Sequence, residues 1–353
     1  MPFENLSERE KQVLYNLVTY YVRSADPVGS RAIAKEFSMG ISSATIRNTL
    51  QDLEELGLVE QPHTSAGRIP TDLGYRVYVD YLLKPDHLSK KEKELIKHSI
   101  LKEGRGIKEI LGQTCRVLGD IANQLGVSIA PRFDEGIFRR LDLIPLTSDR
   151  MMVVVVVQSG LARSVIVEVQ TSIPEDEVRT VEMILNERLS GLSLGEIRKT
   201  VSERLKDVQP AGRLVNLIIN SRDKIWTEDR AESVLTSGAE HLVSQPEFAS
   251  HQDMSALVRL LDSKVLSKFL SDFDQEGLVI AIGKENLFSE VMKCSLVTST
   301  YRVGNITGTI GIIGPTRMPY NKLVSLVDYT ARTLSDALSG LMDSGDKVNG
   351  QKA

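Results

Sequence analysis

The sequence has 353 residues, which is enough for two or three domains. Hydrophobic residues make up 41% and charged residues 25% of the chain, a composition that excludes wholesale disorder. The formal net charge is −4, so the chain is not a polycation that coats nucleic acid, and any nucleic-acid contact has to be local and specific in its geometry.

Cysteine, histidine and apolar patterns exclude several other classes. Two cysteines are too few for a disulfide framework or a multi-cysteine metal site, and the five histidines lack metal-ligand spacing. The beginning of the chain carries no apolar signal segment. The longest purely apolar run, Met151 to Val157, is far shorter than the roughly 20 residues that span a bilayer. We therefore expect a cytoplasmic protein with no cofactor, no metal and no membrane partner.

Three helical segments are predicted near the beginning of the chain, over residues 7–23, 31–37 and 42–56. Ser7 and Glu10 have the spacing of a capping box at the start of the first helix. Ser30 is the expected N-cap of the second helix, and Gly57 lies at the C′ position that ends the third.

The segment after these helices changes character. Residues 58–60 resemble a short strand, and residues 61–70 are polar and punctuated by proline and glycine. Residues 75–81 are aromatic and apolar, and their periodicity fits either a strand or the start of a helix. Three helices followed by a strand, a loop and a strand are typical of a winged helix-turn-helix, which we predict for residues 1–85.

The rest of the chain predicts a multidomain α+β protein. Residues 86–100 are rich in lysine and are the expected linker. The valines of residues 153–157 lack alternation, which is typical of a strand covered on both faces. The β-rich stretches are separated by about 100 mainly helical residues. We predict one α/β sheet domain formed by residues 101–172 and 272–342, a mainly helical insertion over residues 173–271, and a tail over residues 343–353. Two sequential α+β domains are the alternative.

One enzyme motif is matched by letters alone. Residues 191–195 fit G-x-S-x-G, but this nucleophile motif requires a strand before it and a helix after it. Residues 181–189 look helical, so we expect a turn between two helices and no nucleophile at Ser193. Phosphate-binding and dinucleotide-binding glycine motifs are lacking, and the residues support no enzyme.

The third helix carries a pattern that suits nucleic acid. Ile46, Leu50 and Leu53 share one stripe, which we expect to be buried. The other faces carry side chains that suit a major groove: amides for adenine, arginine for guanine or phosphate, and methyl groups for thymine. Serines at the helix N-terminus would stand beside phosphates. The candidate DNA contacts of this helix are Ser42, Ser43, Ala44, Thr45, Arg47, Asn48 and Gln51. Such residues are also common on solvated helix faces.

The loop over residues 62–71 strengthens the nucleic-acid hypothesis. It places one cation, Arg68, at the expected tip of a small-residue loop between two β-like segments, as a wing that inserts an arginine into a minor groove requires. The candidate wing contacts are His63, Thr64, Ser65, Gly67 and Arg68.

The charge of this region argues for two copies. Residues 1–83 hold eight basic and eleven acidic residues, so a single copy would neutralise few phosphates. A two-fold symmetric homodimer on a palindrome would double the contacts.

Blocks at both ends of the chain carry a family pattern. They include P-V-G-S-R at 27–31, S-S-A-T-I-R-N at 42–48, P-H-T-S-A-G-R-I-P-T at 62–71 and G-T-I-G-I-I-G-P-T-R-M at 308–318. These blocks resemble the HrcA family of heat-inducible transcription repressors. Asp26 and Thr49 stand where that family pattern has glutamate and methionine, and residues 170–270 carry no recognisable motif.

The resemblance implies a negative regulator of class I heat-shock operons, which encode chaperonin and chaperones. It implies a homodimer on an inverted-repeat operator in double-stranded DNA, with repressor activity maintained by the chaperonin. It also implies that the sheet domain is GAF-like and that the inserted domain dimerises. The alternative is a GAF-like transcription regulator that senses a small molecule, because a fold does not by itself fix function.

Overall fold

The structure is a computed structural model that describes residues 6–64, 66–101, 106–170, 173–208, 212–227, 233–271, 273, 276–286, 288 and 292–349. The chain forms two compact units, which are described separately. The first comprises Met1–Ser128, Leu235–Thr300 and Ile310–Ala331, and the second comprises Ile129–Val234, Tyr301–Thr309 and Arg332–Ala353.

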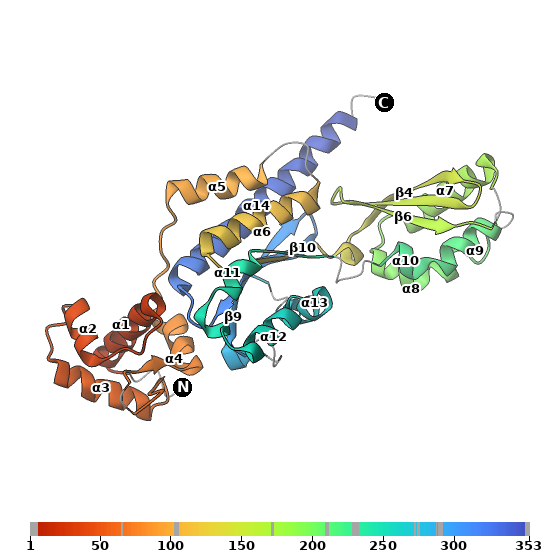
Figure 1. Ribbon diagram of the computed structural model, residues 1–353. Helices are drawn as coiled ribbons and strands as arrows, with labels where there is room; N and C mark the ends of the chain where they lie inside the picture. The colour runs from red at the N-terminus through yellow and green to blue at the C-terminus, as the bar shows by residue number, and fades with distance from the viewer. Residues whose placement is uncertain are drawn as a thin grey trace. The chain divides into compact units, whose positions relative to one another are not determined.

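The first unit begins with the expected winged helix-turn-helix (Figure 1). Its elements are α1 (Glu8–Ser24), α2 (Ser30–Glu36), α3 (Ser43–Glu55), β1 (Val59–Glu60), β2 (Ile69–Pro70), α4 (Asp72–Val77) and the π-helix η2 (Tyr78–Leu82). The strands β1 and β2 pair antiparallel, with Val59 opposite Pro70. The segment 75–81, which fitted a strand or a helix, is helical. The N-cap of α2 is Gly29, so the expected cap at Ser30 is wrong by one residue.

A small core holds these helices together. The capping box of Ser7 and Glu10 is confirmed and starts α1, whose buried side chains include Leu14 and Leu17. α1 contacts both α2 and α3. A close backbone approach completes the core, because a Cβ at Gly74 would lie 1.9 Å from the Leu58 carbonyl oxygen. α4 therefore packs directly on the chain that leads out of α3.

The remainder of the first unit is built on a five-stranded sheet of order β7-β3-β10-β9-β8. The strands are β3 (Leu125–Ile129), β7 (Val234–Ser237), β8 (Leu278–Ile282), β9 (Cys294–Val303) and β10 (Ile306–Pro315). β7 lies in a stretch that we expected to be helical. The prediction failed because a four-residue strand between helices is too short to show the alternating pattern of a strand.

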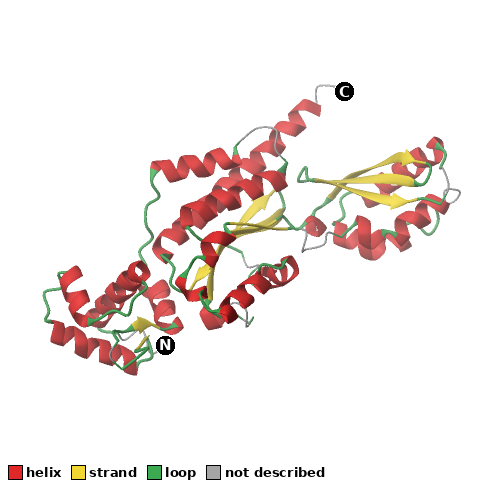
Figure 2. Cartoon of the chain, viewed as in Figure 1, coloured by secondary structure: helices red, strands yellow, loops and turns green. Residues whose placement is uncertain are grey.

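Helices and short 3₁₀ turns accompany this sheet (Figure 2). They are α5 (Lys90–Ile100), α6 (Ile107–Ala122), α11 (Ala239–Val243), η4 (Pro246–Phe248), α12 (His251–Leu260), α13 (Ser263–Ser271), η5 (Gly283–Glu285) and α14 (Tyr320–Asn349). α14 includes residues 343–349, so the expected tail is wrong over those residues. Residues 350–353 lie outside the described residues.

α5 corrects the expected linker over residues 86–100. A capping box of Ser89 and Glu92 starts the helix, and Ile96 and Ile100 are buried. Hydrogen bonds from Ser89 and from Lys322 of α14 lower the pKa of Glu92 to about 2. The lysines that suggested a linker therefore lie on the outer side of a folded helix.

The second unit has a sheet of its own, in the order β4-β5-β6. Its elements are η3 (Phe133–Glu135), β4 (Phe138–Thr147), β5 (Arg150–Val157), β6 (Ala162–Glu168), α7 (Glu175–Leu189), α8 (Leu194–Arg204), α9 (Gly212–Asn220) and α10 (Arg222–Ile225). Side chains of the sheet and of these helices form one buried cluster, in which Phe138 and Trp226 meet edge to face at 6.1 Å between ring centroids.

These strands correct the predicted borders of the insertion. We expected residues 101–172 to share a sheet with 272–342, but β4, β5 and β6 pair only with one another. β3 and β7 are neighbours in the five-stranded sheet, so the chain leaves that sheet after Ile129 and returns at Val234. The excursion covers residues 130–233 and not 173–271. Strand patterns do not specify which sheet a strand joins, and this caused the error.

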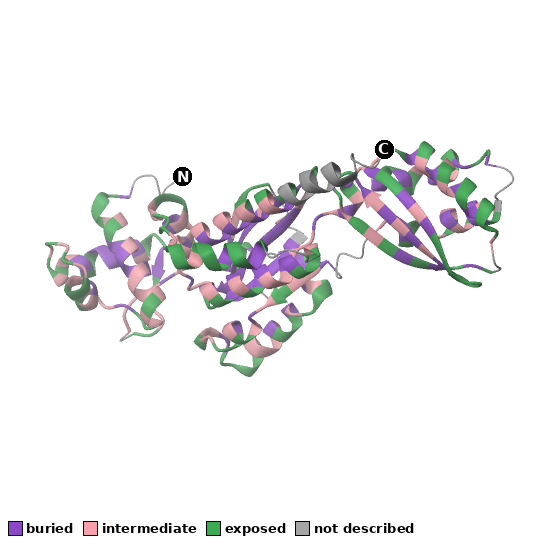
Figure 3. Cartoon of the chain, turned by 90° about the horizontal axis from the view of Figure 1, so that it is seen from above, coloured by how far each residue is buried: buried purple, intermediate pink, exposed green. Residues whose placement is uncertain are grey.

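The valine run is also less enclosed than expected. Residues 153, 155 and 157 are fully buried, whereas the valines between them are half-buried, as the alternating colours of the strands in Figure 3 show. β5 is therefore the central strand of a sheet with helices on one face. The prediction of two covered faces is wrong, because β-branched side chains also suit a half-exposed strand face.

The structure also tests the predicted turn at Ser193 and shows whether any described helix could cross a membrane. The expected turn is confirmed, since Ser193 lies between α7 and α8 and its hydroxyl accepts a hydrogen bond from the Glu196 backbone N–H at 3.2 Å. Among the helices that the structure describes, none has the length and apolar character needed to cross a membrane.

Gly74 and Gly112 have contrasting surroundings and therefore provide a test of stability. Gly74→Ala should destabilise the winged helix by about 1–3 kcal/mol, because its Cβ would overlap the Leu58 backbone. Gly112→Ala is the matched control in α6, where nothing lies within 4 Å of the new Cβ, and it should stabilise the chain by about 0.5–1 kcal/mol. Urea unfolding followed by circular dichroism measures both. Equal effects of the two substitutions would contradict the packing described here.

Candidate nucleic-acid interface

The candidate interface begins with the N-terminal turn of α3. The Ser42 hydroxyl accepts a hydrogen bond from the Thr45 backbone N–H at 3.1 Å and lies 2.9 Å from the Thr45 hydroxyl. Ser43 is the first residue of the helix. Of the two serines considered as caps, Ser42 is therefore the N-cap, and the first turn presents hydroxyls and backbone N–H groups.

The buried face of α3 confirms the predicted stripe. Ile46, Leu50 and Leu53 are at most 4% exposed. Thr49 is also buried, and its hydroxyl donates to the Thr45 carbonyl at 3.1 Å, which satisfies the polar group inside the helix. This face fixes the rotation of α3 about its own axis.

The opposite face of α3 carries the predicted base-contacting side chains. Ala44, Arg47, Asn48 and Gln51 are all exposed, whereas Ser43 and Thr45 are half-buried. No residue that the structure describes forms a hydrogen bond or ion pair with the side chains of Arg47, Asn48 or Gln51. Their donors and acceptors are therefore available to an external partner.

Basic and acidic side chains lie at different ends of α3. The last turns carry Asp52, Glu54 and Glu55, whereas the first turns carry Arg47 and no acid. Phosphates would be repelled by the acidic end and attracted by the N-terminus of the helix dipole. The arrangement therefore suits entry of the N-terminal half of α3 into a groove.

The wing is a closed loop between β1 and β2. The Gln61 side chain donates from Nε2 to the carbonyls of Thr64 at 3.0 Å and Ala66 at 2.9 Å. His63 and Thr64 are exposed at the turn of this loop. Ser65, also a predicted contact, lies outside the described residues. Sequence reasoning missed Gln61, although a long amide side chain beside a small-residue loop is the available signal.

Arg68 lies at the base of the wing, and its predicted place at the tip is wrong. Its backbone pairs with Val28 through hydrogen bonds of 2.8 and 2.9 Å. Its guanidinium contacts a carboxylate oxygen of Glu54 at 2.7 Å from Nη2 and 2.9 Å from Nε. The side chain of Arg68 is 21% exposed. Arg68 therefore ties the wing to the last turn of α3.

Gly67 has a structural role in the same contact. A Cβ at this position would lie 2.4 Å from the Val28 carbonyl carbon. Only glycine lets the wing approach the segment between α1 and α2 so closely. The P-V-G-S-R and T-S-A-G-R motifs are thus two sides of one backbone contact.

Metal chemistry and thiol chemistry find little support in the described part of the chain. Its histidines, cysteines and carboxylates form no group of three or more that could hold a metal ion. Burial raises the pKa of both Cys115 and Cys294 to about 12, which makes their thiols poor nucleophiles.

A helix-turn-helix followed by a two-stranded wing defines the class of winged-helix DNA-binding proteins. Residues 5–80 match the family described as winged helix-turn-helix transcription repressor, HrcA DNA-binding, and residues 108–324 match the HrcA protein C terminal domain. The chain belongs to the HrcA family of heat-inducible transcription repressors, which is not a class of enzymes.

Individual relatives agree along nearly the full length. The heat-inducible transcription repressor HrcA of Chlorobium phaeobacteroides (strain BS1) is 41% identical, over 96% of this chain and 100% of that one. The protein of the same name from Chlorobaculum tepidum is 40% identical, over 96% of this chain and 99% of that one. A crystal structure of a hypothetical protein shares the fold, with a TM-score of 0.59, 24% identity, and coverage of 95% of this chain and 99% of that one.

The N-cap of α3 can be tested apart from DNA. Ser42→Ala should destabilise the winged helix by about 1 kcal/mol, because the Thr45 N–H loses its acceptor. Ser43→Ala, one residue on, should change stability by less than about 0.5 kcal/mol, since alanine favours the helix interior. Thermal unfolding of both variants compares them. The assignment of the cap is wrong if Ser43→Ala costs as much as Ser42→Ala.

Proposed function

We propose that this chain represses class I heat-shock operons, which encode chaperonin and chaperones, by binding an inverted-repeat operator as a homodimer. The observation that carries the DNA-binding part is the exposed face of α3, whose amides and guanidinium have no partner among the described residues. Side chains of this kind hydrogen-bond to base edges in a major groove.

The residues take different roles in this proposal. Arg47, Asn48 and Gln51 read base edges, and Ala44 and the Thr45 methyl meet thymine methyl groups. Ser42 and Ser43 contact phosphates at the N-terminus of α3.

The wing contacts DNA through His63, Thr64 and Ser65 in this proposal. Gly67 allows the wing to close. Arg68 fixes the wing against α3 and reaches DNA only where it exchanges its Glu54 partner for the minor groove, whose narrow form attracts arginine.

A homodimer is supported by the electrostatics and by one apolar surface. The region around α3 has more acids than bases, so two copies are needed to gather enough phosphate contacts. In the second unit, Ile144, Met152 and Ile166 are aligned across the three strands on the face away from the buried cluster, and Ile144 and Ile166 are 42% and 48% exposed. We assign this outer face of the inserted unit to contact with a second copy.

In this proposal, the way in which heat regulates the repressor is inferred from membership of the HrcA family. The chaperonin maintains the cytoplasmic repressor, and when unfolded proteins occupy the chaperonin the repressor loses activity and the operons are expressed. Relatives that are 41% and 40% identical to this chain are named heat-inducible transcription repressors, which supports this assignment.

The base-reading face is tested by amide substitutions. Asn48→Ala and Gln51→Ala should each weaken binding to an inverted-repeat operator by about 1–3 kcal/mol, because a bidentate contact to a base is lost. Gln12→Ala removes an equally exposed amide from α1 and should leave the affinity unchanged. Fluorescence anisotropy at one fixed salt concentration, with a scrambled operator as competitor, measures the affinities. Unchanged affinity in both α3 variants would refute the base-reading assignment.

A further inference from the structure

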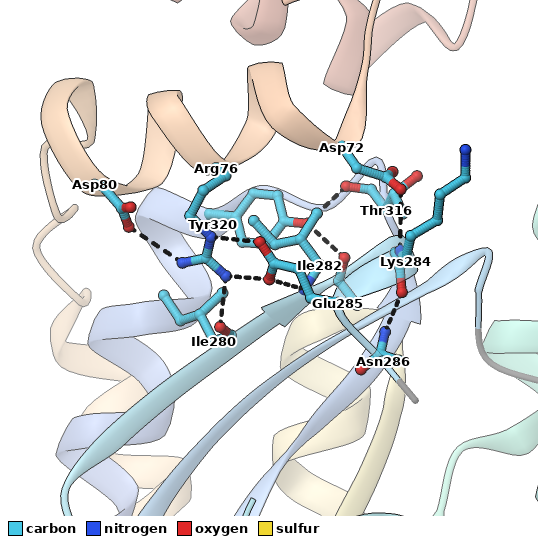
Figure 4. A network of polar contacts seen from close by, with 12 residues as sticks. Asp72, Arg76, Asp80, Ile280, Ile282, Lys284, Glu285, Asn286, Thr316 and Tyr320 are labelled. Carbon is cyan, nitrogen blue, oxygen red and sulfur yellow. Dashed lines mark hydrogen bonds and ion pairs between the residues drawn. The ribbon is translucent and has the colours of Figure 1, made fainter. Parts of the chain in front are cut away.

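One helix of the winged helix is bound to the sheet part of the first unit by a guanidinium–carboxylate pair. Arg76 of α4 donates from Nε to Glu285 Oε1 at 2.7 Å, and its Nη2 contacts the other oxygen of the same carboxylate. Nη2 also donates to the Ile280 carbonyl in β8 at 2.7 Å. Figure 4 shows Arg76 of α4 reaching both Glu285 of η5 and the Ile280 carbonyl of β8. A paired guanidinium and carboxylate fix direction as well as distance.

A second contact lies one turn earlier in α4. Asp72 accepts a hydrogen bond from the Lys284 backbone N–H at 3.0 Å. Gly283 has a φ of +51°, and a Cβ there would lie 2.4 Å from the Asp72 carboxylate oxygens. The glycine therefore lets the Asp72 carboxylate reach the 3₁₀ turn η5.

A third contact joins a different helix of the winged helix. Arg317, between β10 and α14, donates from Nη1 to the Val22 carbonyl near the end of α1 at 2.8 Å. Glu247 of η4 holds the same guanidinium, with Nε to Oε1 at 2.6 Å, and the side chains of Arg317 and Glu247 are only 12% and 21% exposed. This arginine is thus held in place from the sheet side.

These contacts determine orientation more than folding. The winged helix has its own core, and α4 packs on it where Gly74 approaches the Leu58 backbone. Tyr75 of α4 also meets Tyr320 of α14, at 5.8 Å between ring centroids, so an aromatic contact accompanies the polar ones. The covalent connection to the sheet part is residues 83–89, which form no helix or strand. This connection is itself held at one point, because the Asp86 backbone N–H donates to the Asn321 carbonyl at 3.0 Å and the Asn321 amide donates to the Asp86 carboxylate at 2.7 Å. Together with this anchor, the contacts on α1 and α4 permit one orientation. Arg76 and Glu285 are 26% and 37% exposed, so solvent screens part of the attraction between them.

We infer that Asp72, Arg76 and Arg317 are positioning residues that hold the winged helix at one orientation on the sheet part of the first unit. In a dimer this sets the spacing and phase at which two copies of α3 meet DNA. The inference rests on the proposed function, and it adds that discrimination between operators of different half-site spacing depends on residues that touch no DNA.

Two substitutions on opposite sides of the contact test the inference, with a control. Arg76→Ala and Glu285→Ala remove the same ion pair from the winged helix and from the sheet part. Arg198→Ala removes the ion pair of Arg198 with Asp223 in the second unit, at 2.7 Å, and controls for the loss of a surface pair. Binding of the full-length proteins is measured on a single half-site, on the operator, and on an operator with about 5 extra base pairs between half-sites, roughly half a helical turn.

The wild-type chain and Arg198→Ala should lose most of their affinity when the half-sites are put out of phase. Arg76→Ala and Glu285→Ala should bind the single half-site within about twofold of wild type, bind the operator about tenfold more weakly, and lose little on the out-of-phase DNA, because freely oriented heads lower the effective concentration of the second one. Hydrogen exchange at the Lys284 N–H should become faster in these two variants, since α4 no longer holds Asp72 against it.

The outcomes separate the two claims. Wild-type protein that fails to prefer the operator over a scrambled duplex refutes the proposed function. Wild-type protein that prefers the operator, together with variants that keep its full affinity and spacing preference, refutes the positioning inference alone. An equal loss on the single half-site and on the operator also overturns the inference, because it shows that the ion pair only supports the fold of the winged helix.

Discussion

The packing of the apolar stripe of α3 against α1 is the constraint on which the candidate interface depends. Once Ile46, Leu50 and Leu53 are buried, the geometry of a helix leaves Asn48 and Gln51 no direction but outward. The hydroxyl cap at Ser42 fixes where the helix begins, so Asn48 lies in the second turn and Gln51 in the third, directly before the acidic end. The proposed base recognition therefore rests on a hydrophobic contact that lies away from the DNA-binding face.

Close contacts between backbone segments hold the wing and α4 in place beside α3. The wing closes on the segment before α2 because position 67 is glycine, and α4 packs on Leu58 because position 74 is glycine. Arg68 and Glu54 then join the wing to α3 through an ion pair. As a result, α3, the wing and α4 behave as one body, and the contacts of α4 with Glu285 and Lys284 act on the DNA-facing helix without a contact of their own to it.

The topology of the five-stranded sheet allows the second unit to form a core separate from that of the winged helix. Because β3 and β7 are adjacent, the chain can leave the sheet at one strand end and return beside it, and the excursion folds around its own buried cluster. An apolar outer sheet face is thus carried on a unit with a core independent of the winged helix. The proposed surface for a second copy and the proposed surface for DNA can then change separately.

The sequence by itself determined the elements whose signals are local. The capping box of Ser7 and Glu10, the stripe of α3, the glycine after it and the turn at Ser193 all follow from residues within one helix of each other, and the block 62–71 was sufficient for the family. Only the tertiary structure decided which sheet each strand joins, that residues 90–100 are helical and packed, and that Arg68 faces Glu54 and not the tip of the wing. Each of these features depends on partners distant along the chain. A periodic pattern indicates which face of an element is apolar, but it does not indicate which other element packs against that face.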